Sequence, residues 1–316
     1  MEISTLLIIK VFLTGVLISF CLTPLVKYLS FKVGAVDEPS ERKVHKKIMP
    51  RLGGVAIFLA FIISLLIYLP FDELISLMGL IMGGLVILFV GIIDDIYNIR
   101  PIYKLLGQII AALIFVAFGS QVIYLSAPFE GLIYLGVLSI PVTIFWLVGV
   151  SNAVNLIDGL DGLASGVTGI ALFIFALVAL KTGQPLIALV SLALLGGVIG
   201  FFPHNFHPAK IFLGDCGALF LGFVVAGISV MGLLKSVTLI TFMIPVLILG
   251  VPIFDTCFAI VRRFKCHKPI FQADGDHLHH RLLRLGLSHK QTVLFIYAIS
   301  AGLGLGAILF VTNGYY

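Results

Sequence analysis

LIYLGVLSIPVTIFWLVGVSNAVNLIDGLDGLASGVTGIALFIFALVAL, residues 132–180, joins two long apolar segments through a polar island at 151–166. Residues 132–150 and 163–180 are each long enough to cross a bilayer as a helix, which needs about 20 apolar residues. The island between them carries Asn152, Asn155, Asp158 and Asp161. This stretch therefore predicts two membrane helices connected by a strongly polar segment.

The polar island has two interpretations. If residues 156–163 are helical, Asp158 and Asp161 share one helix face, and Asn155 extends that face by a turn. An isolated Asp-Gly-Leu-Asp-Gly sequence is also typical of a polar loop or of helix caps. Whether the island has a functional role depends on whether the other polar clusters of the chain lie on the same side of the membrane.

The composition predicts an integral membrane protein. The chain has 316 residues, of which 60% are hydrophobic and 11% charged, and its mean hydropathy is +1.19. A soluble globule of this size needs more polar surface, and the long apolar runs do not alternate as barrel strands do. We expect an all-α, polytopic membrane helical bundle that forms a single transmembrane domain over residues 1–316. The N-terminus has an acid at Glu2 and no basic segment, so it predicts a first span and not a signal peptide.

About ten spans are expected, and the basic residues orient them. The spans are 5–27, 52–69, 74–93, 102–119, 132–150, 163–180, 184–202, 216–233, 237–261 and 291–311. All Lys and Arg residues fall in the loops after spans 1, 3, 7 and 9, except Lys10, Lys181 and Lys235. The positive-inside rule places those loops in the cytoplasm and both termini outside. The net charge of +5 is thus a property of one face, suited to anionic lipid or to an anionic soluble substrate.

Acidic residues cluster at the cytoplasmic ends of the spans. Asp94 and Asp95 end span 3, where adjacent carboxylates indicate a nearby cation or simple solvent exposure. Asp215 stands in a Gly-Asp-Cys-Gly step before span 8, which allows close approach of a ligand or makes an ordinary helix N-cap. Asp255 lies inside span 9, where a functional role and an ion pair with another span's basic residue are equally expected.

Basic residues and histidines occupy the same face. The loop at 36–54, with His45 and Arg51, is as well explained by anchoring to anionic lipid as by substrate binding. The segment after span 9 holds three histidines within four residues, His277, His279 and His280, followed by Arg281. Their spacing matches no standard zinc site, and beside Arg and Lys they suit a phosphate clamp better.

These groups together favour phosphoryl transfer at a membrane surface. Carboxylate and amide oxygens without thiolate select a hard cation, Mg²⁺ or alternatively Mn²⁺, which usually binds together with substrate phosphates. A cation-coupled transporter is the rival class, but carriers keep their ionisable residues near the bilayer midplane. A purely structural, lipid-anchoring protein would need the basic residues but not five carboxylates on one face.

Four ordered motifs carry a resemblance to a known family. They are Asp94-Asp95, NLIDGLDGLA at 155–164, FLGDCGALFLG at 212–222 and HLHHR at 277–281. With them the chain resembles the polyprenyl-phosphate N-acetylhexosamine-1-phosphate transferases, nearly from end to end. DEPSERKVHKKIMPRLGG and DGDHLHHRLLRLG are similar to the WecA/TagO branch, which implies UDP-GlcNAc as the donor. A phospho-MurNAc-pentapeptide transferase of the MraY type is the alternative.

The resemblance implies transfer of GlcNAc-1-phosphate from UDP-GlcNAc to undecaprenyl phosphate, with release of UMP, as the first membrane step of an envelope glycan. It implies Asn155 and Asp215 as Mg²⁺ ligands. It implies a catalytic group comprising Asp94, Asp95, Asp158, Asp161 and His280. It implies substrate contacts from His45, Arg51, Lys104, Asn152, His277, His279 and Arg281.

The expected partners follow from the same resemblance. They are the UDP-sugar, the polyprenyl phosphate and membrane lipids of a bacterial plasma membrane, with no nucleic acid, and a homodimer is compatible with the sequence. Because a phosphate monoester is already mostly dianionic near neutral pH, we expect Asp94 and Asp95 to align the acceptor more than to remove a proton. A covalent aspartyl-phosphate intermediate stays open as a second route.

Overall fold

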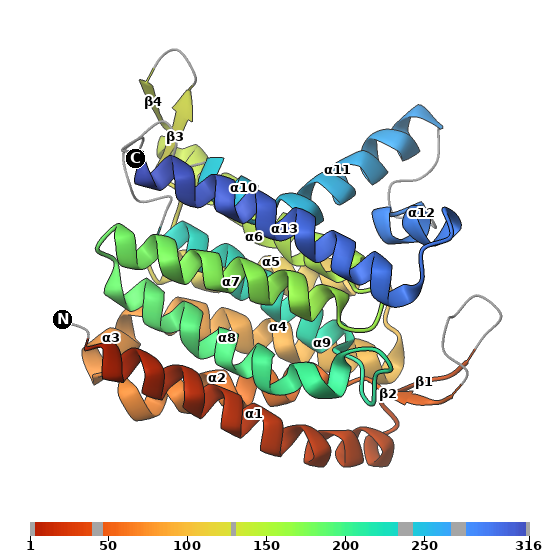
Figure 1. Ribbon diagram of the computed structural model, residues 1–316. Helices are drawn as coiled ribbons and strands as arrows, with labels where there is room; N and C mark the ends of the chain where they lie inside the picture. The colour runs from red at the N-terminus through yellow and green to blue at the C-terminus, as the bar shows by residue number, and fades with distance from the viewer. Residues whose placement is uncertain (1–3, 40–46, 128–130, 233–242, 267–275, 314–316) are drawn as a thin grey trace.

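Over the residues that the structure describes, the chain folds into a bundle of helices with two short antiparallel strand pairs (Figure 1). The computed structural model describes residues 4–39, 47–127, 131–232, 243–266 and 276–313. The helices are α1 (Thr5–Val33), α2 (Gly53–Tyr68), α3 (Phe71–Ser76), α4 (Met78–Tyr97), α5 (Pro101–Ala117), α6 (Ser139–Ile157), α7 (Leu163–Lys181), α8 (Pro185–Asn205), α9 (Gly214–Met231), α10 (Met243–Ile248), α11 (Gly250–Lys265), α12 (Leu278–Arg284) and α13 (His289–Thr312), with a 3-10 turn, η1, at Gly136–Leu138. The antiparallel pairs are β1 (Val36–Asp37) with β2 (Met49–Pro50), and β3 (Tyr124–Ala127) with β4 (Gly131–Tyr134).

The prediction of a polytopic helical membrane protein is confirmed. Among the described residues, seven helices are long and apolar enough to cross a membrane, namely α1, α4, α6 with its preceding turn η1, α7, α8, α9 and α13. Two shorter apolar helices, α2 and α5, coincide with two further predicted spans. The connection between α5 and α6 contains the β3–β4 hairpin.

The ninth predicted span is not one helix. Part of it, 237–242, lies outside the described residues, and the remainder is divided into α10 and α11 at Leu249. Pro252 gives the physical reason, because a proline ring clashes with the carbonyl four residues earlier, here that of Ile248, the last residue of α10. Helix α11 then leans away from the bundle (Figure 1).

Helix α9 is the centre of the bundle. Nearly all of its residues are buried, and it packs against α2, α4 and α6. Glycines bring these helices into contact, since a Cβ on Gly54 would lie 2.2 Å from Cα of Gly217, and a Cβ on Gly91 would lie 2.3 Å from Cα of Cys216. Such close approach is how helices pack in lipid, where dispersion contacts replace the hydrophobic effect between helices.

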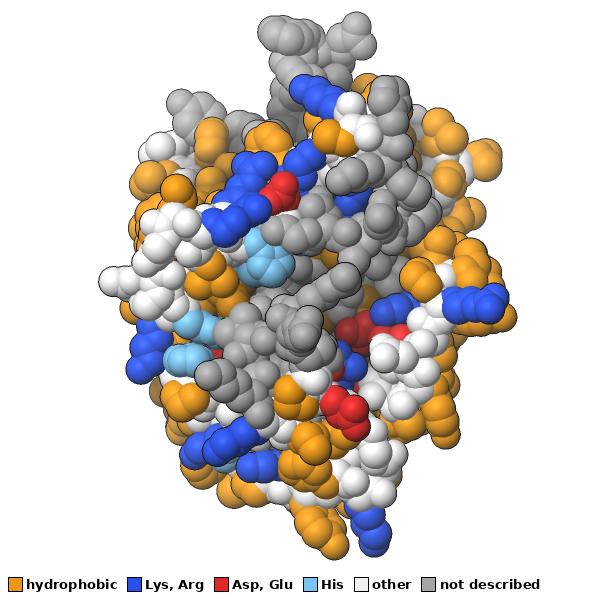
Figure 2. Space-filling model, turned by 90° about the vertical axis from the view of Figure 1, so that its right-hand side faces the viewer, with side chains coloured by type: hydrophobic (Ala, Val, Ile, Leu, Met, Phe, Trp, Pro, Cys, Tyr) orange, Lys and Arg blue, Asp and Glu red, His pale blue; other side chains and the backbone are white. Residues whose placement is uncertain are grey.

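The polar segments gather at one end of the bundle. In Figure 1 the β1–β2 hairpin, the α8–α9 connection and α12 all lie at the right-hand end, whereas α1 begins and α13 ends at the opposite end. Figure 2, which looks onto the right-hand end, shows Lys, Arg and His side chains around acidic ones, with hydrophobic side chains towards the rim. The fold therefore presents at this end a polar face built from connections far apart in the sequence.

Candidate active site

A cavity of about 610 Å³ opens at this polar end. It is lined by Asp37, Lys47, Met49, Arg51, Asn155, Asp158, Gly159, Leu160, Asp161, Asn205, His207, Pro208, Ala209, Phe212, Leu213, Gly214, Asp215, His280 and His289. Six of the residues singled out from the sequence share this wall: Arg51, Asn155, Asp158, Asp161, Asp215 and His280. The cavity has the size and the mixed polar lining of a small-molecule site.

Asp215 is placed by a glycine that no other residue can replace. Gly214 has φ +77, and a Cβ there would lie 1.8 Å from the backbone oxygen of Arg51. The segment after β2 is held against it by backbone hydrogen bonds, from Gly53 to Phe212 O at 3.1 Å and from Gly54 to Leu213 O at 2.9 Å. The Gly-Asp step therefore projects the carboxylate from the first turn of α9 into the cavity.

Lys104 joins two of the predicted carboxylates. Its Nζ lies 2.9 Å from Asp94 Oδ2 and 2.8 Å from Asp215 Oδ2. The geometry depends on the tight α4–α5 connection, in which Asn98 adopts a left-handed conformation (φ 52) and Pro101 begins α5. One ammonium group thus bridges carboxylates from α4 and α9 and offsets one negative charge between them.

Asp95 has different partners from its neighbour. Its carboxylate accepts the backbone N–H of Asp215 at 3.0 Å and that of Cys216 at 3.0 Å. These are donors that the first turn of a helix leaves free, so Asp95 caps α9 and complements its dipole. Asp94 and Asp95 are both buried and neither lines the cavity. Asp95 therefore affects the site indirectly, by holding the first turn of α9 in place.

Of the two interpretations of the polar island, the structure shows the polar loop and not a helix over residues 156–163. Helix α6 ends at Ile157 with Asp158 as its C-cap, and α7 starts only after Gly162, which has φ +78. Asp158 and Asp161 therefore lie in a turn, not on a helix face, yet both still line the cavity. Burial, with the neighbouring carboxylates of Asp215 and Asp95, raises the pKa of Asp158 to about 8.

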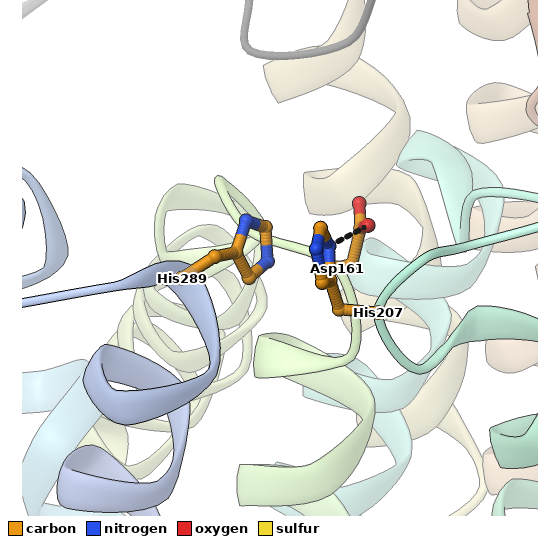
Figure 3. Close-up of side chains that lie close together, drawn as sticks. All are labelled: Asp161, His207 and His289. Atoms are coloured by element: carbon orange, nitrogen blue, oxygen red, sulfur yellow. Dashed lines mark hydrogen bonds and ion pairs between the residues drawn. The ribbon is translucent and has the colours of Figure 1, made fainter.

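Asp161 organises a second polar group. Its Oδ2 lies 2.8 Å from Nδ1 of His207 and accepts the backbone N–H of Ala209 at 3.1 Å. The imidazole of His289, the first residue of α13, stacks on that of His207 with ring centroids 4.1 Å apart (Figure 3). His207 and His289 were not singled out from the sequence, because neither belongs to one of the motifs that carry the resemblance. Their only signal is a position at the polar end of an apolar helix.

The predicted histidine group of α12 is divided by the fold. His277 Nδ1 lies 2.8 Å from Asp255 Oδ2, and the N–H of Leu278 donates to Asp255 Oδ1 at 2.9 Å, so Asp255 anchors the start of α12. His279 is buried against Gly159, where burial and the neighbouring histidines lower its pKa to about 3 and keep it neutral. Of this group, His280 lines the cavity. Arg281 is exposed.

The other predicted contacts have clear positions. Asn152 exchanges hydrogen bonds with Gln108, at 2.6 and 3.2 Å, which joins α6 to α5 outside the cavity lining. Arg51 forms an ion pair with Asp37 at 2.9 Å, so the hairpin after α1 contributes both signs of charge to the cavity. His45 lies outside the described residues.

The donor set fits a hard divalent cation. Asn155 lies against the carboxylate of Asp215. Beside them, Oδ1 of Asp94 is buried and accepts no hydrogen bond from the described residues. A buried, unpartnered carboxylate oxygen next to two further oxygen ligands is the arrangement that Mg²⁺ satisfies.

The fold and the site define a multi-pass membrane protein with a cavity of paired acids and bases at one end of its bundle. Residues 77–233 match glycosyl transferase family 4. A probable undecaprenyl-phosphate N-acetylglucosaminyl 1-phosphate transferase of Bacillus subtilis (strain 168) is 45% identical over 303 residues, covering 96% of this chain and 84% of the relative. The chain therefore belongs to glycosyl transferase family 4.

Two further relatives mark the range of the family. A decaprenyl-phosphate N-acetylglucosaminephosphotransferase of Mycobacterium tuberculosis (strain ATCC 25618 / H37Rv) is 37% identical over 314 residues, covering 90% of this chain and 78% of the relative. A phospho-N-acetylmuramoyl-pentapeptide-transferase of Streptococcus pneumoniae (strain CGSP14) is 38% identical over 256 residues, covering 76% of each. The resemblance seen in the motifs is thus confirmed over nearly the whole chain.

Proposed function

We propose that this protein transfers GlcNAc-1-phosphate from UDP-GlcNAc to undecaprenyl phosphate, forming undecaprenyl-diphosphate-GlcNAc and UMP. Similarity to the Bacillus and Mycobacterium relatives supports the GlcNAc donor. In this reaction an oxygen of the lipid phosphate attacks the phosphorus that bears the sugar, and the bond between the two phosphates of the donor breaks. The chain acts as one catalytic unit, with its polar end in the cytoplasm and both termini outside.

The observation that carries the proposal is the meeting of Asp215, Asn155, Asp94 and Lys104 beside a cavity of nucleotide-sugar size. We assign Asn155 and Asp215 as the ligands of Mg²⁺, with Mn²⁺ as a substitute. When bound, the cation would offset the charge of the donor diphosphate. Lys104 lies close enough to contribute a second positive charge to the same phosphates.

The remaining residues bind and orient. Asp158 and Asp161 shape the wall for the nucleotide sugar, while Arg51 and His280, which also line the cavity, would bind phosphate. Asp94 positions the acceptor phosphate, which needs no base because its second pKa is about 6. Asp95 is a positioning residue, because it fixes the first turn of α9 and with it the direction of Asp215.

The test measures UMP release by the purified protein with Mg²⁺ and undecaprenyl phosphate. UDP-GlcNAc, UDP-GalNAc and UDP-MurNAc-pentapeptide are offered separately, and we expect release with UDP-GlcNAc. Asp215→Asn should lower the rate by on the order of 100-fold. Asp72→Asn, which alters an exposed carboxylate in the short α3 helix, is the matched control. Release with the muramyl donor alone would move the protein to the pentapeptide-transferase branch, and no release with any donor would refute the proposal.

A further inference from the structure

A tyrosine of α13 reaches the turn that carries two of the cavity acids. Tyr297 is half-buried on α13, which packs along α7 (Figure 1). Its hydroxyl donates a hydrogen bond to the backbone oxygen of Gly162, the residue that directly follows Asp161 and caps the start of α7. Tyr297 does not itself line the cavity, so its influence on a ligand there passes through this turn.

A second glycine makes room for this contact. Gly166, in the first turn of α7, lies against the phenol, and a Cβ at this position would overlap both the hydroxyl oxygen and the ring. Glycine is a poor helix former, so the chain gives up helix stability at the point where the tyrosine enters. The slot at Gly166 fixes the direction from which the hydroxyl of Tyr297 meets Gly162.

The backbone of Gly162 depends on its contacts to hold one conformation. It has φ 78 and ψ -7, a left-handed conformation that glycine enters and leaves at little cost. The direction of its carbonyl group sets ψ, so a donor that holds this oxygen confines the residue. The N–H of Gly166 donates to the same oxygen at 2.9 Å, but that bond lies within the α7 segment itself. Tyr297 ties the oxygen to a different helix.

The first turn of α7 is also held by α8. Ser165 Oγ donates to Asn205 Oδ1 at 2.7 Å, and Asn205 Nδ2 donates to the backbone oxygen of Ile211 at 3.1 Å. All three residues are buried. The start of α7 is thus fixed to both α8 and α13, and the α13 contact acts on the backbone next to Asp161.

The position of this turn matters for a bound ligand. Four consecutive residues, 158–161, line the cavity, and Gly162 connects them to α7. A rotation at Gly162 would move the carboxylate of Asp161, which lies 2.8 Å from Nδ1 of His207. Displacements of binding groups by about 1 Å are enough to weaken their action on a substrate.

We propose that Tyr297 is a positioning residue for the donor. Through the carbonyl group of Gly162 it holds the 158–161 turn in the shape that binds the UDP-sugar. The identity of this ligand rests on the proposed function, whereas the contact itself does not. Tyr297 is 135 residues from Gly162 in the sequence and belongs to none of the motifs that carry the family resemblance.

The first experiment uses Tyr297→Phe, which removes the hydroxyl and keeps the ring that fills the slot. Calorimetry measures the Kd for UDP-GlcNAc with Mg²⁺, and UMP release with undecaprenyl phosphate gives KM and kcat. We expect the Kd and the KM for UDP-GlcNAc to rise by about 3- to 10-fold, as for the loss of one neutral hydrogen bond. The kcat and the KM for undecaprenyl phosphate should stay as in the native protein.

Tyr68→Phe is the matched control. Tyr68 is also half-buried, and its hydroxyl forms a hydrogen bond with Thr14 Oγ1 at 2.9 Å between two helices. It is the last residue of α2, whose first residue lies beside the cavity segment at Arg51. Its substitution should leave the Kd and the KM for UDP-GlcNAc unchanged.

Hydrogen–deuterium exchange gives a readout that requires no activity. Backbone amides of residues 158–166 should exchange faster in Tyr297→Phe than in the native protein or in Tyr68→Phe, because Gly162 is less confined. In an Asp161→Asn background, Tyr297→Phe should raise the Kd by a smaller factor than in the native background, since both substitutions affect the same group.

The outcomes separate this proposal from the proposed function. A native protein that binds UDP-GlcNAc but releases no UMP with any donor would refute the proposed function alone, and a native protein that binds no UDP-sugar would overturn both. Unchanged exchange in the turn, or faster exchange with an unchanged Kd, would overturn the role of Tyr297. An equal effect of Tyr68→Phe, or an equal factor in the Asp161→Asn background, would do the same by indicating a general loss of stability.

Discussion

Replacing Lys104 by methionine tests how the protein balances its buried carboxylates. Lys104 is about a quarter exposed, and Asp94 and Asp215 are 7% and 24% exposed at their side chains. At separations of 2.9 and 2.8 Å each pair attracts by roughly 6 kcal/mol at an effective dielectric constant of about 20, before the cost of desolvation is subtracted. Removing one partner of a buried pair costs about 3–5 kcal/mol, and the partial exposure of Lys104 places this case near 3 kcal/mol.

The measurement is thermal unfolding of the purified protein, with chelator and then with increasing Mg²⁺. With chelator, Lys104→Met should unfold at a clearly lower temperature, because two adjacent carboxylates lose their counter-charge. Mg²⁺ should stabilise the variant more than the native protein, since in the native protein the ammonium group already occupies the space between the carboxylates. Lys181→Met is the control, because Lys181 is exposed and its Nζ bonds to Thr312 alone among described residues. Equal midpoints of native and variant with chelator, or equal shifts with Mg²⁺, would refute this reasoning.

Three further substitutions test the site and its support. Asp158→Asn should stabilise the chelator-treated protein increasingly as the pH rises from 4 to 8, by up to about 1 kcal/mol per pH unit. The reason is that the native carboxyl has a higher pKa in the folded than in the unfolded state, so it lowers the free energy of unfolding at any pH above the unfolded-state pKa. A difference between the melting curves that does not change with pH would contradict this. Gly91→Ala should destabilise the bundle by about 3 kcal/mol or more, because the new Cβ meets Cys216, whereas Gly149→Ala, which meets nothing within 4 Å, should melt like the native protein. Asp94→Asn should lower the transfer rate at every pH, and recovery of that rate at high pH would instead assign Asp94 as a general base.

Much of the cavity lining could be predicted because charged residues at the ends of membrane spans are confined to the two membrane surfaces. Asn155, Asp158 and Asp215 follow or precede apolar segments, so one side of the membrane collects them regardless of how the helices pack. Arg51 was predicted by the same reasoning. The order of the spans and the distribution of basic residues were sufficient to place these groups on one face.

What the sequence could not show are contacts set by packing. Asp94 and Asp95 look equivalent as neighbours, but successive helical residues point about 100° apart, so one meets Lys104 and the other the start of α9. The helical and the loop interpretations of the α6–α7 segment both stayed open, because nothing in the sequence shows that Gly162 adopts a left-handed conformation. His207 acquires its partners only through tertiary contacts.

The burial of α9 has a consequence for how the protein is made. As the chain leaves the ribosome from its N-terminus, α2, α4 and α6 enter the bilayer before α9 does. Until α9 arrives, the carboxylate of Asp95 has no helix to cap, and Asp94 and Lys104 face a gap that lipid or water must fill. A nascent chain arrested before residue 214 is therefore an incomplete bundle with charged groups along an open seam. The contacts that complete the site are therefore also the contacts that close the bundle.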